Sequence, residues 1–94
     1  MSFGIDVNIL LYASDRSSPW HEKASAFLQR CAAGSEVFCI AWVTAQSYLR
    51  MATHGSIFAQ PLSADEAAGN VEALLALPHC RALWEDEGFW EVYR

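Results

Sequence analysis

The amino-acid sequence predicts an α/β fold built on a short parallel sheet. Three short apolar runs indicate buried strands, and segments with helical spacing of apolar residues separate them. Strands that alternate with helices form right-handed βαβ units, in which successive strands lie parallel. The chain has 94 residues, of which 53% are hydrophobic, so it has apolar side chains enough for one small core.

The first strand and a short helix meet at an acidic residue. Residues 2–5 form an apolar run compatible with a buried strand, and the apolar segment 8–13 predicts the helix. Asp6 lies between the two. Because ligands bind beyond the carboxyl ends of parallel strands, Asp6 stands where a functional residue is expected.

The clearest helix is predicted to begin at Ser18 and Pro19, which suit the N-cap and the first helical position. Gly34 is a typical C-terminal stop. Between these signals one helical face is apolar, and it is formed by Trp20, Ala24, Phe27, Leu28 and Cys31. We expect this face to pack in the core or in a dimer.

Two more strands and two more helices complete the pattern. Residues 37–40 are a β-type run, and residues 42–54 predict a helix that Gly55 ends. Ser63 opens a capping box, so another helix begins there and stops before Pro78.

The end of the sequence predicts a third strand at residues 80–84 and the opening of a further helix in residues 85–94. The acidic run Glu85-Asp86-Glu87 is interpreted as the negative first turn of that helix rather than as a cation site.

Composition restricts the function classes. The formal net charge is −5, so bulk charge does not attract nucleic acid, and RNA binding requires a local patch or a metal ion. The three Cys have no close spacing, which predicts free thiols in a reducing compartment. The sequence shows neither a signal peptide nor a membrane span, so a cytoplasmic protein is expected.

Two interpretations fit Asp6 on position alone. Its carboxylate can cap the helix that follows, or it can serve as a ligand for a hard cation. Asn8 can orient Asp6 or bind a water, and a second local cap is the alternative.

A family resemblance favours the metal interpretation. Residues 5–13, Ile-Asp-Val-Asn-Ile-Leu-Leu-Tyr-Ala, resemble the opening of the PIN domain of VapC-type toxins. Residues 18–24, residues 49–54 with Phe58 and residues 60–63, and residues 77–83 are similar to later parts of that domain, in the same order. The resemblance implies a three-layer PIN-like fold and a toxin that cleaves RNA endonucleolytically with Mg²⁺ or Mn²⁺ held by acidic residues. It also implies a cognate antitoxin as partner.

The sequence departs from the family pattern in two places. Many members have a Glu three residues before the position of Arg50, whereas Ser47 stands here after Gln46. The later acidic residues of the family lie in a C-terminal portion that the 94 residues do not contain. Residues 1–94 are therefore expected to be a partial PIN domain without the C-terminal strands, and only Asp6 is carried over as a catalytic metal ligand.

The sequence thus predicts a Mg²⁺-dependent endoribonuclease toxin, whole or truncated, with Asp6 as metal ligand and Asn8 and Arg50 as supporting residues. Arg50 can contact a phosphate or form a structural ion pair. The alternative is a catalytically inactive remnant that binds an antitoxin or self-associates. The high apolar content and the open sheet edge expected of a partial domain favour a homodimer. An unrelated phosphotransfer domain is disfavoured, because no glycine-rich phosphate loop is present.

Overall fold

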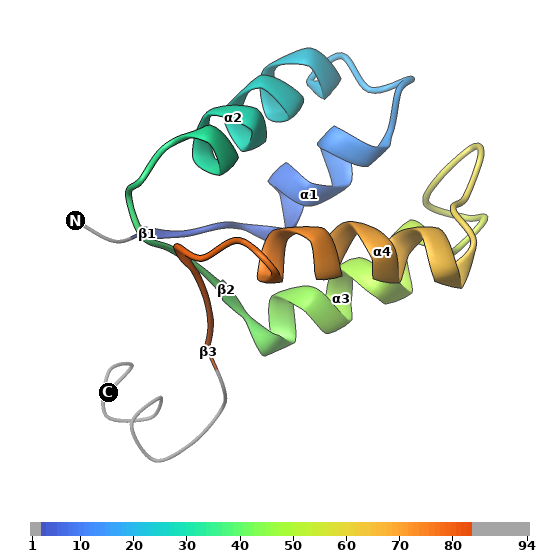
Figure 1. Cartoon of the computed structure of the whole chain (residues 1–94). Helices are drawn as coiled ribbons and strands as arrows, with labels where there is room; N and C mark the ends of the chain where they lie inside the picture. Colours follow the sequence, from blue (N-terminus) through green and yellow to red (C-terminus); the bar gives the residue numbers. More distant parts are fainter. Residues whose placement is uncertain (1–2, 84–94) are drawn as a thin grey trace, which may run out of the picture.

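A three-stranded parallel sheet organises the molecule, and two pairs of helices connect its strands (Figure 1). The computed structural model describes residues 3–83. The elements follow one another as β1 (Phe3–Gly4), α1 (Val7–Ser14), α2 (His21–Ala33), β2 (Phe38–Ala41), α3 (Trp42–Ala52), α4 (Ala64–Leu75) and β3 (Cys80–Leu83). Strand order is β1-β2-β3, with Phe3 opposite Phe38 and Phe38 opposite Cys80. The predicted α/β fold with a short parallel sheet is confirmed.

One face of this sheet is covered and the other is open in the described residues. Phe38 and Ile40 of the central strand are 0% and 1% exposed, whereas Cys39 between them is only half-buried. On β3 the same alternation leaves Cys80 buried and Leu83 48% exposed. Because side chains alternate between the two faces of a strand, the helices cover a single face.

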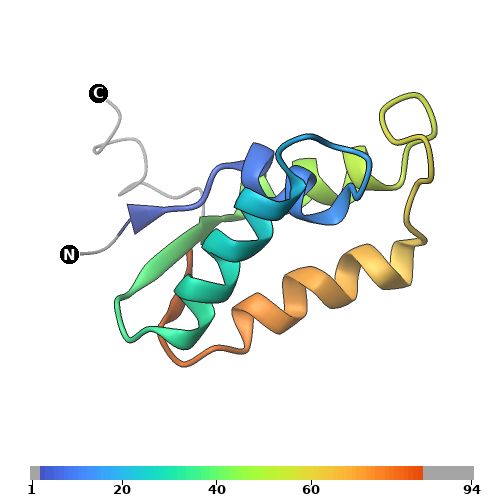
Figure 2. The same cartoon turned by 90° about the horizontal axis from the view of Figure 1, so that it is seen from above.

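The core lies between that face and the helices. A single cluster of buried side chains joins the sheet to α1, α3 and α4, and Leu28 and Cys31 of α2 pack against it. Figures 1 and 2 show the strands toward one end of the molecule and α3 and α4 extending from there. Residues 3–83 therefore supply the sheet and one helical layer of the three-layer arrangement that the resemblance implies.

Capping signals located most helix ends correctly. Asp6 caps α1, and the predicted capping box at Ser63 is present, with reciprocal bonds of 3.1 Å and 3.0 Å to Glu66. Gly34 ends α2 as predicted. The helix predicted to reach His54 ends at Ala52, and the ring of His54 bonds to Ser56 in the following turn.

The predicted start of α2 is wrong by two residues. Ser18 accepts from the N–H of Trp20 at 3.1 Å, and its carbonyl accepts from His21, so Ser18 forms a turn before the helix instead of capping it. Trp20 is 52% exposed beside Lys23, whose Nζ lies 5.7 Å from the ring centre, so Trp20 does not belong to the buried face of α2.

Two sequence-based expectations lie outside the described residues. These are the helix predicted in residues 85–94 and the acidic run Glu85-Asp86-Glu87. Within residues 3–83, none of the helices is both long and apolar enough to span a membrane.

Candidate functional site

Asp6 lies at the carboxyl end of the sheet, between β1 and α1. The N–H of Ile5 donates to the carbonyl of Cys39 at 2.9 Å, which ties the chain to β2 immediately before Asp6. The Asp6 side chain accepts from the N–H of Asn8 at 3.2 Å and caps the helix, while remaining exposed. The cap interpretation is therefore confirmed, and it engages only one carboxylate oxygen, Oδ1.

The same bond defines what Asn8 does. It orients the Asp6 carboxylate through its backbone N–H, and its own side chain is exposed. The supporting role predicted for Asn8 stays a prediction, because this bond uses only the backbone N–H and is the helix cap itself.

Arg50 does not join Asp6. Helices α1 and α3 both leave the carboxyl end of the sheet, and their far ends meet where Ser14 bonds to Tyr48. Arg50 lies eight residues beyond Trp42 in α3, or about 12 Å along the helix axis from the sheet. A direct supporting role beside the Asp6 carboxylate is thus not favoured by the arrangement.

The described residues do not form a metal centre by themselves. Among residues 3–83 no group of three His, Cys, Asp or Glu side chains converges. Mg²⁺ can be held through one or two carboxylates together with water and substrate oxygens. Asp6 can supply one such ligand, but residues 3–83 bring together too few donor side chains to hold an ion tightly.

The three His rings are occupied in local bonds. His79 Nε2 lies 2.7 Å from the carbonyl of Cys31, and His21 Nδ1 lies 3.1 Å from the carbonyl of Tyr12. His54 bonds to Ser56. The bonds of His79 and His21 join segments that are 48 and 9 residues apart along the chain.

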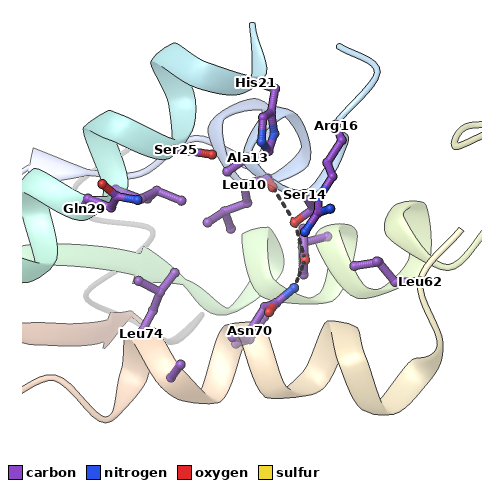
Figure 3. Close-up of a pocket in the computed structure, with 14 residues that line it drawn as sticks. Leu10, Ala13, Ser14, Arg16, His21, Ser25, Gln29, Leu62, Asn70 and Leu74 are labelled. Carbon is purple, nitrogen blue, oxygen red and sulfur yellow. Dashed lines mark hydrogen bonds between the residues drawn. The ribbon is translucent and has the colours of Figure 1, made fainter. Parts of the chain in front are cut away.

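A pocket of about 490 Å³ lies at the other end of α1 from Asp6, and all four helices contribute to it (Figure 3). A hydrogen-bond chain crosses its floor. Asn70 Nδ2 donates to Tyr48 Oη at 2.9 Å, and Tyr48 Oη lies 2.7 Å from Ser14 Oγ. Because Ser14 Oγ donates its single proton to the carbonyl of Leu10 at 3.0 Å, Tyr48 must donate to Ser14.

Sequence reasoning missed this pocket. Ser14, Tyr48 and Asn70 come from three helices and are 34 and 22 positions apart along the chain. No local spacing joins them, so only the packing of the helices brings them together.

Comparison with known proteins identifies the family. No family model matches the chain. Ribonuclease VapC48 of Mycobacterium tuberculosis is 39% identical over 94 residues, which is all of this chain. The chain is a homologue of the VapC ribonucleases. Ribonuclease VapC37 of the same organism is 32% identical over 74 residues, or 79% of the chain.

A solved VapC structure has a similar fold. The crystal structure of Mycobacterium tuberculosis VapC20, a toxin that cleaves the sarcin–ricin loop, matches 99% of this chain with a TM-score of 0.63 at 12% sequence identity. The predicted PIN-like architecture is thereby confirmed for the described part.

The chain spans 65% of the length of VapC48, 51% of VapC37 and 66% of the VapC20 chain. This VapC homologue shares the fold of its relatives over the part that it covers.

Proposed function

We propose that the whole protein is a metal-dependent endoribonuclease, the toxin of a toxin–antitoxin pair, and that Asp6 supplies one carboxylate of its catalytic site. The observation that carries this proposal is the exposed carboxylate at the carboxyl end of β1, in a chain 39% identical over all its residues to a named VapC ribonuclease.

The geometry of Asp6 suits a metal ligand that must be preorganised. The Asn8 N–H fixes Oδ1, and the bond from Ile5 to the Cys39 carbonyl fixes the backbone, so the other oxygen has a defined position. A bound Mg²⁺ or Mn²⁺ would supply an activated water and stabilise charge on the phosphate. An ion held in this way also gives an acidic protein a local means of engaging RNA.

The decisive variant is Asp6→Asn in the complete gene product. Asparagine keeps the size of the side chain and an oxygen that can accept from Asn8, but it removes the charge. RNA cleavage in Mg²⁺ should fall by about 100-fold or more, which corresponds to about 2.7 kcal/mol of transition-state stabilisation.

Asp65→Asn provides the matched control, because Asp65 is an exposed acid in the first turn of α4 rather than at the carboxyl end of the sheet. Its cleavage rate should equal that of the unmodified protein. Cleavage that survives Asp6→Asn would refute the assignment of Asp6.

The pocket supports a second candidate function, namely docking of a partner protein such as the cognate antitoxin. It lies between α2 and α4, is open to solvent, and is lined in part by apolar side chains of the early helices. This role does not require Asp6, so it also fits a catalytically inactive form of the protein.

A further inference from the structure

A single arginine lines the pocket of a protein that is acidic as a whole. Arg16 and His21 line it, and no Asp or Glu does, although the chain carries a formal net charge of −5. Within residues 3–83 Arg16 makes no ion pair, while the carboxylate of the adjacent Asp15 accepts from the N–H and hydroxyl of Ser17 at 3.1 Å and 2.6 Å. Arg16 is therefore the one formally charged side chain among the described residues that line the pocket.

Aliphatic side chains line the pocket beside the polar Ser25 and Gln29 of α2. Leu28 of α2 and Leu74 of α4 line it, together with Leu62 and Val71. Figure 3 shows Arg16 and His21 on the side of the opening away from Leu74. A ligand that fills the pocket must therefore bring an apolar group and an anionic group side by side.

The polar floor restricts the ligand further. The direction of the chain from Asn70 through Tyr48 to Ser14 is set by the carbonyl of Leu10, so both hydroxyl protons in it are already donated. The ligand does not gain a hydroxyl donor there, and Arg16 remains the strongest donor in the lining.

A nucleotide fits this lining poorly. The only aromatic residue that lines the pocket besides His21 is Tyr48, and it is 1% exposed, so its ring does not offer a face for stacking a base. One arginine is also few for a phosphate backbone, which is normally met by several cations. An aliphatic side chain next to a carboxylate can contact the aliphatic residues of the lining and pair with Arg16 at the same time.

We infer that the pocket binds a segment of a partner protein that carries an Asp or Glu within one helical turn of an aliphatic side chain, with the carboxylate on Arg16. This inference rests on the proposed docking function and is independent of RNA cleavage. It names Arg16, an exposed side chain that lines the pocket, as a specificity-determining residue, because a partner that lacks the acid loses a charge-assisted bond.

The test is a selection of random 16-residue peptides, displayed on phage, against the immobilised full chain. Peptides that bind should be enriched in an acid three or four residues from Leu, Ile or Met. Binding of one synthetic peptide, followed by fluorescence anisotropy, should weaken by about three- to tenfold for Arg16→Gln.

Arg30→Gln is the matched control, because Arg30 is an exposed arginine of α2 that does not line the pocket. It should bind the peptide as the unmodified chain does. Replacing the acid of the peptide by Gln should remove the difference between Arg16→Gln and the unmodified chain, which makes the pair a double-mutant cycle.

Several results would overturn the inference: peptides without the acid, a selection that yields no peptide, equal effects of the two arginine variants, or binding of adenosine monophosphate that depends on Arg16. Asp6→Asn should leave peptide binding unchanged. A protein that binds the peptide but does not cleave RNA would therefore refute only the enzymatic proposal, and the converse result would refute only this one.

Discussion

The hydrogen-bond chain under the pocket gives the most direct test of the described packing. Tyr48 is 1% exposed, and its hydroxyl bonds both Asn70 of α4 and Ser14 of α1. Tyr48→Phe removes these two bonds and keeps the ring. Each such bond contributes about 0.5–1.5 kcal/mol net, and Asn70 can regain water because it is exposed, so the free energy of unfolding should fall by about 1–2 kcal/mol.

Urea unfolding followed by circular dichroism measures this loss. With a slope of about 1–2 kcal/mol per molar urea, the midpoint should move down by about 1 M. All variants should be compared at one protein concentration, because self-association would raise the apparent stability.

Tyr12→Phe is the control for Tyr48→Phe. Tyr12 is a half-buried tyrosine of α1 whose hydroxyl makes no hydrogen bond within residues 3–83. Its removal should shift the midpoint by much less. Equal midpoints for Tyr48→Phe and the unmodified chain would refute the hydrogen-bond chain.

Two other predictions concern the cap of α4 and the open face of the sheet. The bond from the Ser63 N–H lowers the pKa of the Glu66 carboxyl in the folded chain. The ionised carboxyl therefore stabilises the fold at pH values above the pKa of an unfolded glutamate, and this stabilisation is lost as the pH falls through the lowered pKa of the folded state. Glu66→Gln should therefore reduce the thermal midpoint at neutral pH and converge with the unmodified chain in acid; a constant difference would contradict the capping role. If the predicted homodimer forms through the open face, Leu83→Lys should reduce self-association in sedimentation velocity. Ile57→Lys, in a loop residue that is also 48% exposed, should not, and equal behaviour of the two variants would exclude this face as the dimer contact.

Local signals predicted most of the fold. The apolar runs located all three strands to within a few residues, because a short buried parallel strand has no polar side to obscure it. The Ser63 capping box fixed the start of α4, since its two reciprocal bonds lie within four residues. The helix start predicted at Ser18 was wrong, because a Ser before a Pro suits a turn as well as a helix cap.

The open face of the sheet was not visible in the sequence of any one strand. Residues 37–40 are continuously apolar, which is typical of a strand buried on both sides. The structure shows Cys39 only half-buried and Leu83 exposed on that side. Residues 37–40 thus have the pattern of a strand buried on both faces, whereas the helices within residues 3–83 cover only one face of the sheet.

Of the candidate sites, the sequence located Asp6 but not the pocket. The position of Asp6 at the end of a strand could be predicted from the topology, and its role as a metal ligand stays a prediction that rests on the family resemblance. Arg50 was associated with it through the family pattern, but the length of α3 separates the two. The pocket could not be predicted, because Arg16 lies in a loop and its neighbours across the pocket belong to α3 and α4.

Helix α1 links the two sites and also keeps them apart. Asp6 caps its first turn, and Ser14 in its last turn holds the chain that leads to Tyr48 and Asn70. Eight residues of helix place them about 12 Å apart along the axis, so a ligand in the pocket does not have to touch the carboxylate. Inhibition of RNA cleavage by a pocket-bound peptide would therefore require either a displacement of α1 or a longer partner that reaches Asp6. Short and extended versions of one selected peptide distinguish these routes: inhibition by both indicates the helix, and inhibition by the extended version alone indicates direct contact.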